Sequence, residues 1–384
     1  MDDASALYIG LISGTSADSI DAALVSFNGE TAQLRASHAE PWPAELATQI
    51  VTLAQGEARF DLDVFGRLDV AIGRCFANAA LHLLEQSGTD AASVRAIGSH
   101  GQTLRHRPSG SYPFTLQLGD PSIIAECCGI DVVADFRRAD VAAGGQGAPL
   151  VPALHATLLG QRGQTRVVLN LGGIANITIL HADGHVHGFD TGPANGLLDA
   201  WCLRQLGEPF DRDGVFAASG RVNQALLDAL LADPYFALMP PKSTGREHFH
   251  LDWLAGYASL KTLRPADVQA TLLELTARSV AAAITQHAAD ANEVLVCGGG
   301  LHNTVLLHRL QQLLAPRLVT STARYGVDPD FLEAIAFAWL ARQRVLGRPG
   351  NLPAVTGARG LRVLGGLYSS PDAAASARIR SGDN

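Results

Sequence analysis

The chain has 384 residues, of which 47% are hydrophobic and 17% charged, and its formal net charge is -8. This length exceeds what one hydrophobic core usually supports, so we expect a globular protein with two domains. The negative charge and the lack of a basic cluster argue against nucleic acid as a partner. No segment has the pattern of a signal peptide or the length of a membrane span, so we expect a cytoplasmic protein without membrane contact.

Cysteine and lysine usage narrows the chemistry. The five cysteines are odd in number and have no CxxC spacing, which argues against a disulfide framework and a structural zinc site. The two lysines, Lys242 and Lys261, do not follow a GxxxxG loop, so the chain has no Walker A site. If ATP binds, backbone groups of glycine turns must hold its phosphates.

Two segments share one layout of strand, glycine turn and strand. Residues 7–27 read YIGLI, SGTSADS and IDAALVSF, and residues 167–191 read VVLNL, GGIAN and ITIL, with a further strand ending in DTG. One such unit opens each half of the chain. The repetition predicts two similar α/β lobes that face each other across a cleft.

Helices and strands alternate along the rest of the chain, which indicates the α/β class. We expect helices over 65–86, 265–287 and 303–314, and strands over 94–99 and 294–297. The region from Asp233 to Glu247 is polar and contains Pro240-Pro241, so we expect a loop there. The predicted organisation is an N-terminal lobe over 1–165, a C-terminal lobe over 166–368 and a flexible tail over 369–384.

Three glycine-rich turns are candidate nucleotide contacts. Ser13–Asp18 is a hairpin tip of small residues where a polyphosphate can approach the backbone, and Asp18 is placed to hold Mg²⁺ through water. Leu171–Asn176 is the corresponding turn of the second half. Cys297–Gly300 joins a buried-looking strand to a helix and could contact a ribose or base. Each turn has an ordinary structural alternative, which is a simple hairpin or a strand-to-helix connection.

Asp190 is the candidate catalytic base. It ends a predicted strand and precedes Thr-Gly-Pro-Ala-Asn, so its carboxylate can accept a proton from an attacking hydroxyl or water. The alternative is that Asp190 caps the helix that begins near Gly192.

Polar clusters provide candidate sugar contacts. Ser99–Thr103 closes a strand with several polar side chains, and Asp120 and Asp135–Arg138 add both signs of charge. The alternative for each cluster is a solvated loop. The pairs His185/His187 and His248/His250 have a spacing found in metal sites, but no partner residues complete a ligand set, so we do not expect metal there.

Taken together, these motifs resemble the anhydro-N-acetylmuramic acid kinase family. The similarity runs in order from about Leu7 to Gly357, and the matching segments are GLISGTSADSIDAALV, SHGQTLRHRP, TLQLGDP, DVVADFRRADVAAGGQGAPLVPALH, NLGGIANIT, GFDTGPANGLLDAW, CGGGLHN and NLPAVTGA. The resemblance implies a two-lobed actin/hexokinase-like (ribonuclease H-like) fold. It also implies that water opens the 1,6-anhydro ring of anhydro-N-acetylmuramic acid while O6 receives the γ-phosphate of ATP, giving N-acetylmuramic acid 6-phosphate and ADP.

The resemblance also assigns roles to residues. It implies that Asp190 is the base that activates the water and that Arg137 binds the lactyl carboxylate of the sugar. It also suggests a homodimer. The candidate nucleotide contacts are Gly14, Thr15, Ser16, Asp18, Asp21, Asn170, Gly172, Gly173, Asn176, Gly298, Gly299, Gly300 and Asn303. The candidate sugar contacts are Gln102, Thr103, Asp120, Arg137 and Glu333.

Three residues depart from the family pattern. Ala17, Ser19 and Ala194 stand where the family usually has Leu, Gly and Gly. The expected consequence is retained activity with altered nucleotide affinity. Two alternatives from other classes are a catalytically impaired, actin-like protein that binds sugar and nucleotide, and a metal-dependent hydrolase that uses the His pairs.

Overall fold

The computed structural model of the chain describes residues 6–14, 18–55, 61–245, 248–257, 260 and 262–371. The chain divides into two compact units. The first comprises the residues up to Leu158 together with those from Phe331 onward, and the second is Leu159–Asp330. The second unit is therefore an uninterrupted stretch of chain between two parts of the first.

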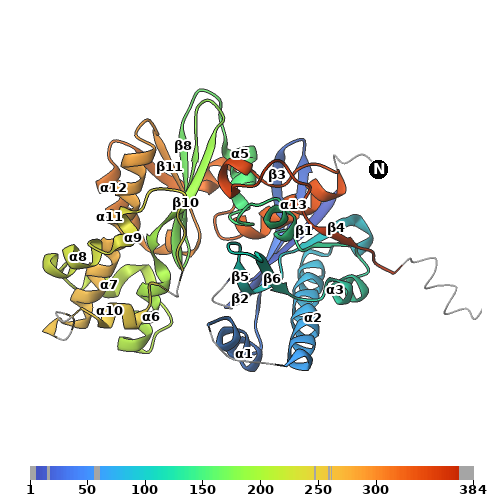
Figure 1. Ribbon diagram of the computed structural model, residues 1–384, viewed down its shortest axis with the longest axis horizontal. Helices are drawn as coiled ribbons and strands as arrows, with labels where there is room; N and C mark the ends of the chain where they lie inside the picture. The colour runs from blue at the N-terminus through green and yellow to red at the C-terminus, as the bar shows by residue number, and fades with distance from the viewer. Residues whose placement is uncertain are drawn as a thin grey trace, which may run out of the picture. The chain divides into compact units, whose positions relative to one another are not determined.

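The first unit is built on a six-stranded sheet in the order β13-β7-β4-β1-β2-β3. Strands β1, β3 and β4 of this sheet are labelled in Figure 1. Strands β1, β2 and β3 form an antiparallel meander, whereas β4 and β7 run parallel to β1. The strands of this unit, including the separate β5-β6 hairpin, are β1 Leu7–Ile12, β2 Ser19–Asn28, β3 Thr31–Pro41, β4 Val94–Ser99, β5 Gln102–Arg107, β6 Phe114–Leu118, β7 Val132–Ala134 and β13 Gly366–Tyr368.

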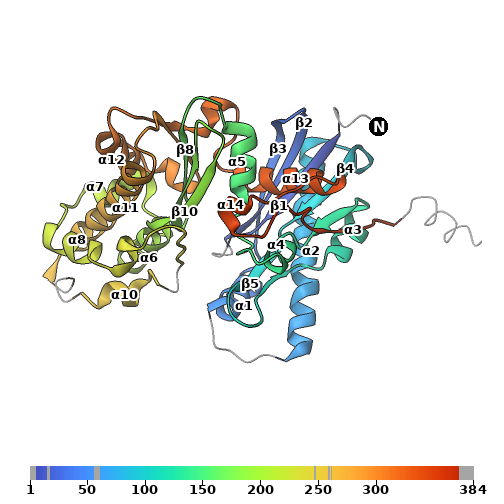
Figure 2. The same cartoon turned by 45° about the horizontal axis from the view of Figure 1, so that its top comes forward.

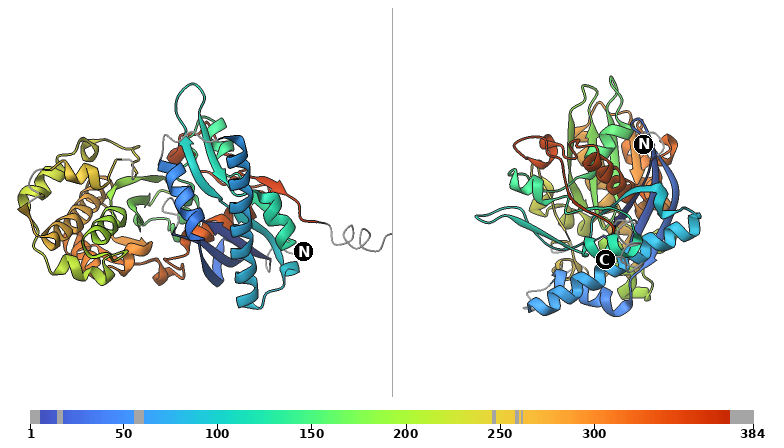
Figure 3. Two further views of the ribbon diagram at one scale, coloured as in Figure 1. Left: turned by 90° about the horizontal axis from the view of Figure 1, so that it is seen from below. Right: turned by 90° about the vertical axis from the view of Figure 1, so that its right-hand side faces the viewer.

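Helices cover both faces of this sheet. The long helix α2 packs with Ile20, Ala22 and Leu24 of β2 on one face, and it lies beside α3 (Figure 3). Asp61 accepts a hydrogen bond from the backbone of Val64 at the start of α2. The helices are α1 Ala44–Gln55, α2 Leu62–Ser87, α3 Pro121–Cys128, α4 Arg138–Ala142, α5 Val151–Leu159, α13 Leu332–Val345 and α14 Pro353–Thr356.

Helix α13 covers the other face of the sheet at unusually close range (Figure 2). A Cβ atom added at Gly10 would lie 1.8 Å from the carbonyl oxygen of Ala334, and one added at Gly98 would lie 2.0 Å from that of Phe337. Only glycine therefore fits at these two positions of β1 and β4. This contact brings the start of α13 to the last residues of β1 and the first residues of β2.

The second unit contains a five-stranded sheet in the order β10-β9-β8-β11-β12. As in the first unit, three antiparallel strands are followed by two parallel ones. The strands are β8 Arg166–Leu171, β9 Ile174–Leu180, β10 Val186–Pro193, β11 Glu293–Cys297 and β12 Leu318–Ser321. The order β3-β2-β1-β4-β7 in one sheet thus matches β10-β9-β8-β11-β12 in the other.

One face of the second sheet packs on helices through a large apolar core (Figure 1). Leu169 and Leu171 of β8 and Ile177 of β9 face this core, together with Leu272 and Leu275 of α11. The helices are α6 Asn195–Leu206, α7 Val215–Ala218, α8 Gln224–Leu231, α9 Pro234–Ala237, α10 Leu251–Ala255, α11 Pro265–His287 and α12 Thr304–Leu314.

The predicted α/β class is confirmed, as is the prediction of two lobes with related sheets. The predicted strand over 94–99 and the predicted helix over 265–287 match β4 and α11. The helix predicted over 303–314 is α12, for which Asn303 is the N-cap.

The predicted lobe boundaries differ from the units in two places. The chain crosses between units at Leu158/Leu159, near the predicted boundary, but residues 331–368 group with the first unit and not with the C-terminal lobe. The reason is the packing of α13 on β1 and β4. Most of the tail predicted over 369–384 lies outside the described residues; within the described part, the backbone N–H of Ser370 donates to Asp131 Oδ1 at 3.0 Å. No helix among the described residues is long and apolar enough to cross a membrane.

Candidate active site

A row of four residues crosses the second sheet at the carboxyl end of β8 and leads to Asp190. Cys297 of β11 pairs with Asn170 of β8, Asn170 pairs with Asn176 of β9, and Asn176 pairs with Asp190 of β10. Paired residues in register place their side chains on the same face of a sheet. That face is opposite the core face, because Leu169, Leu171 and Phe189 point into the core. The amides of Asn170 and Asn176 and the carboxylate of Asp190 therefore form a polar row on this face of the sheet.

The carboxylate of Asp190 is held by the segment that follows α9. The backbone N–H of Thr244 donates to Asp190 Oδ2 at 3.0 Å, and the hydroxyl of Tyr235 donates to the Asp190 carbonyl at 2.7 Å. Burial, followed by the negative charge of Asp190, raises the pKa of Tyr235, so this hydroxyl stays protonated. Lys242 lies 4.8 Å from the centre of the Tyr235 ring, and burial lowers its pKa. The carboxylate is thus fixed in one orientation and remains half-buried.

Asp190 is not at the end of its strand, which corrects the sequence prediction. Strand β10 continues to Pro193, and its register with β9 shifts between Asp190 and Gly192. A bulge of this kind re-aims neighbouring side chains. The alternative role as a helix cap is wrong, because Ala194 is the N-cap residue of α6.

The second glycine turn lies against the start of α6. The backbone N–H groups of Ala194 and Gly196 donate to the Gly173 carbonyl, and that of Asn195 donates to the Gly172 carbonyl, at 3.0–3.1 Å. Ala194 has φ -133°, outside the left-handed region that favours glycine, so its departure from the family pattern is accommodated. The turn is therefore fixed by helix contacts and not by its own flexibility.

The triple-glycine segment after β11 approaches the same turn. Gly298 has φ +81°, and a Cβ there would lie 2.4 Å from Asn170 Oδ1. A Cβ at Gly300 would lie 2.5 Å from Leu171 Cβ. Gly299 begins the 3₁₀ turn Gly299–His302. The predicted nucleotide residues of the second half thus gather at one edge of this unit. Asn303 has a structural role as well, because its Oδ1 accepts the N–H of Leu306 as the cap of α12.

The first unit places Gln102 beside the first glycine turn. Gln102 is fully buried, and its Nε2 donates to the Gly14 carbonyl at 3.2 Å. Among the described residues, neither Gln102 Oε1 nor the buried hydroxyl of Ser99 has a hydrogen-bond partner. Buried polar atoms of this kind usually have partners. The predicted contacts Thr15 and Ser16, and the departure at Ala17, lie outside the described residues.

Arg137 is held by protein groups in the same unit. Its Nε donates to His100 Nε2 at 3.0 Å, and its Nη1 donates to the Gly147 carbonyl at 2.8 Å. Burial and the nearby Arg137 charge place the pKa of His100 well below its usual value, so this ring is neutral and accepts the bond. Burial lowers the pKa of Arg137 to about 10, although Glu333 and Asp140 favour its charged form. A guanidinium fixed in this way can recognise a carboxylate.

Glu333 and Asp21 bring two carboxylates towards each other near the ends of α13 and β2. Solvent reaches part of the Glu333 side chain, yet surrounding protein displaces water from its carboxylate and raises the pKa. The like charge of Asp21 raises it further, and Arg137 opposes this effect. Ser19, one of the departures, donates from its Oγ to Asp21 Oδ1 at 2.9 Å. Asp18 is exposed at the start of this strand.

Two predicted sugar contacts have local structural partners. Asp120 Oδ1 accepts the N–H of Ser122 as the cap of α3, and Thr103 Oγ1 accepts from Gln117 Nε2 at 3.1 Å. The sequence analysis missed several residues that position the site, because their partners are remote in sequence. These residues are Tyr235, Thr244, Asp140 and His100 in its role as a partner of Arg137.

The histidines of the two HxH pairs make contacts with other side chains or cap a helix. His185 pairs with the exposed Asp183, whereas His187 contacts His181 at 3.1 Å. His250 caps α10, and His248 contacts Asp233 at 3.2 Å. Nothing in these contacts supports a hydrolase built on the HxH pairs.

Comparison with known proteins identifies the family. The family model described as anhydro-N-acetylmuramic acid kinase matches residues 6–370. The chain belongs to the anhydro-N-acetylmuramic acid kinase family. It is 57% identical to the kinase of that name from Xanthomonas campestris, with 95% of this chain and 97% of the relative covered. It is 52% identical to the one from Coxiella burnetii, with 94% and 97% covered.

Solved structures also resemble the chain, at lower similarity. A ROK family glucokinase from Streptomyces griseus in complex with glucose and AMPPNP has 15% identity and a TM-score of 0.39, with 88% of this chain and 99% of that chain covered. A 2-hydroxyisocaproyl-CoA dehydratase activator from Clostridium difficile with bound ADPNP has 11% identity and a TM-score of 0.44, with 89% and 96% covered. These TM-scores are too low to carry an argument about ligands.

Proposed function

We propose that the chain is an ATP-dependent kinase that opens the 1,6-anhydro ring of anhydro-N-acetylmuramic acid with water and phosphorylates O6. Family membership over residues 6–370 supports the activity. The observation that carries the proposed mechanism is the polar row that ends at Asp190, beside the glycine turn of the second unit. The matching sheet orders of the two units support the actin/hexokinase-like fold.

Asp190 acts as the general base in this proposal. Its carboxylate accepts a proton from water as the water oxygen bonds to the anomeric carbon, and the bond from that carbon to O6 breaks. O6 then takes the γ-phosphoryl group, which leaves ADP. The N–H of Thr244 keeps the carboxylate in position, and a positioned base of this kind typically contributes about 10²–10⁴ in rate.

The remaining roles follow the contacts within each unit. Gly14, Gly172 and Gly173 offer backbone N–H groups to phosphates, and Gly298–Gly300 let the nucleotide approach the backbone. Gln102 and Arg137 bind the sugar, with Arg137 directed to its carboxylate. Asp120 and Thr103 support these elements through their local hydrogen bonds.

Mg²⁺ fits the acidic residues of the first unit. Asp18, Asp21 and Glu333 are oxygen donors of the type that this ion prefers, and desolvation followed by the like charge of Asp21 raises the pKa of Glu333. When bound, the ion would neutralise charge on the ATP phosphates. We further propose a cytoplasmic location, where ATP is available, and a homodimer. Light scattering of the purified protein, showing twice the chain mass, tests the dimer.

The reaction can be tested directly by mass spectrometry. Purified protein is incubated with ATP, Mg²⁺ and anhydro-N-acetylmuramic acid in H₂¹⁸O. The proposal predicts ADP and a 6-phosphate that carries one ¹⁸O in the sugar and none in the phosphate. Labelled inorganic phosphate in place of the sugar 6-phosphate would show hydrolysis of ATP by water instead, and would overturn the mechanism.

Asp190→Asn tests the base. We expect turnover to fall at least about 10²–10⁴-fold while ATP binding stays near that of the wild type. Asp183→Asn is a matched control, because Asp183 is exposed at the turn that precedes the same strand. Wild-type turnover in the Asp190 variant would exclude the assignment, whereas equal losses in both variants would indicate damage to β10.

A further inference from the structure

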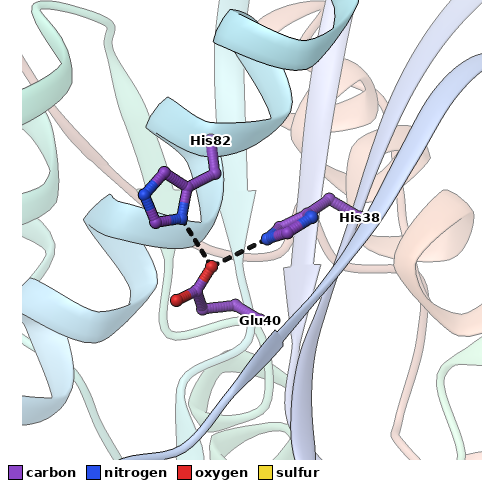
Figure 4. Close-up of side chains that lie close together, drawn as sticks. All are labelled: His38, Glu40 and His82. Atoms are coloured by element: carbon purple, nitrogen blue, oxygen red, sulfur yellow. Dashed lines mark hydrogen bonds and ion pairs between the residues drawn. The ribbon is translucent and has the colours of Figure 1, made fainter.

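Three metal-binding side chains, His38, Glu40 and His82, meet on the first unit (Figure 4). Glu40 Oε2 lies 2.7 Å from His38 Nε2 and 2.6 Å from His82 Nδ1. His38 and Glu40 are partly buried, and about half of the His82 side chain is exposed. Among the described residues, the His, Cys, Asp and Glu side chains that come together in threes or more, with ligand atoms within 4.8 Å of one another, are those of this group.

The fold brings these residues together through strand periodicity and helix packing. His38 and Glu40 are two residues apart on β3, so they share a face of the sheet. They pair with Ala22 and Ile20 of β2, which point into the core that α2 covers. His82 reaches the pair from α2. Asp21 points to the opposite face, so the cluster is separate from the acidic residues proposed for Mg²⁺.

The chemistry of the group is that of a transition-metal site. Two imidazole nitrogens and one carboxylate oxygen are the ligands of many zinc centres with an open position. The preference of imidazole for zinc, copper or nickel also distinguishes this group from an all-oxygen Mg²⁺ site. We propose that His38, Glu40 and His82 bind a divalent transition-metal ion of the zinc type, with solvent completing the coordination.

Protons compete with the metal for these ligands. Although burial acts in the opposite direction, hydrogen bonds from His38 and His82 lower the pKa of Glu40, and the bond to Glu40 raises the pKa of His82. The carboxylate is therefore ionised, and a metal ion competes with a proton for His82. A bound ion would join the edge strand β3 to α2, and so would stabilise the unit without touching the reacting groups.

The experiment uses the full-length protein, freed of metal with a chelator and kept near neutral pH. Co²⁺ is titrated while its visible absorption is recorded, and Zn²⁺ is then titrated by calorimetry. Cys127→Ser serves as the background, because this exposed thiol could bind metal by itself. The test variants are His82→Ala and Glu40→Gln. The control is His187→Ala, which removes the other close His pair, with His181.

We expect one ion per chain, intense Co²⁺ bands, and affinity at least about tenfold weaker in both test variants. The control should match the background in stoichiometry and affinity. Zn²⁺ should raise the thermal midpoint of the background and of the control, but not of His82→Ala. The proposal would be overturned by a dissociation constant weaker than about 1 mM, or by unchanged affinity in His82→Ala. Equal loss in His187→Ala would assign the binding elsewhere and would also overturn it.

Discussion

Replacing Asp140 by asparagine should destabilise the first unit and weaken sugar binding. Asp140 is fully buried, and its Oδ1 accepts from Asn351 Nδ2 at 2.7 Å and from Thr356 Oγ1 at 2.8 Å. Its Oδ2 accepts the N–H of Gly147 at 2.8 Å. The Gly147 carbonyl in turn holds Arg137, so this carboxylate fixes the loop that carries the proposed sugar contact.

The magnitude follows from the three hydrogen bonds. Asparagine keeps one acceptor oxygen for Asn351 and Thr356, but turns an NH₂ group towards the N–H of Gly147. Loss of one hydrogen bond to a buried charged group costs about 1.5–3 kcal/mol, and two donors then face each other. We therefore expect a loss of about 2–4 kcal/mol. For a unit of this size, that corresponds to a fall in thermal midpoint of about 4–16 °C.

Differential scanning calorimetry measures the effect, since the two units can unfold in separate transitions. Asp135→Asn is the matched control, because Asp135 has φ +61°, which asparagine tolerates, and its ion pair with Arg138 is partly exposed at 3.4 Å. The control should change stability by less than about 1 kcal/mol. Equal midpoints for the Asp140 and Asp135 variants would refute the argument, as would an unchanged KM for the sugar in Asp140→Asn.

Other predictions concern different parts of the first unit. Arg137→Lys should raise the KM for the sugar at least about tenfold with a smaller change in kcat, because lysine has no planar pair of donors; equal KM values would contradict this. Gly98→Ala should cost about 3 kcal/mol or more in urea unfolding, since its Cβ would meet the Phe337 carbonyl, and a normal midpoint would contradict the close packing. The pair of His82 with Glu40 should stabilise the metal-free protein below the usual His pKa of 6.5, and this contribution should disappear as pH rises through the raised folded-state pKa. After solvent screening this contribution to the free energy of unfolding is less than about 1 kcal/mol, and His82→Ala should remove it. A difference in stability between the wild type and His82→Ala that grows as pH rises would contradict this prediction.

Local signals in the sequence predicted the repeated parts of the fold well. The alternating apolar residues of Val94–Ser99 predicted a strand, and the proline at the start of α11 predicted where that helix begins. Neither prediction needs information from other parts of the chain. The glycine turns and Asp190 were recognised in the same way, because each motif is contiguous. The bulge after Asp190 was not predicted, since it depends on pairing with β9.

Contacts between remote segments could not be predicted. Helix α13 is apolar nearly all round, so no stripe in its sequence indicates which sheet it covers. The bond from Arg137 to His100 joins residues 37 positions apart, and that from Asn351 to Asp140 joins residues 211 apart. The group of His38, Glu40 and His82 on β3 and α2 was missed for the same reason, because His38 and His82 approach each other only in the folded unit.

The return of the chain to the first unit has a consequence for its synthesis. Strands β1 and β4 are made early, yet the helix that closes over Gly10 and Gly98 belongs to the segment after Asp330. The second unit is complete before that helix leaves the ribosome, and it can fold at once as a continuous stretch. One face of the first unit's sheet therefore stays uncovered until the segment after Asp330 has been made.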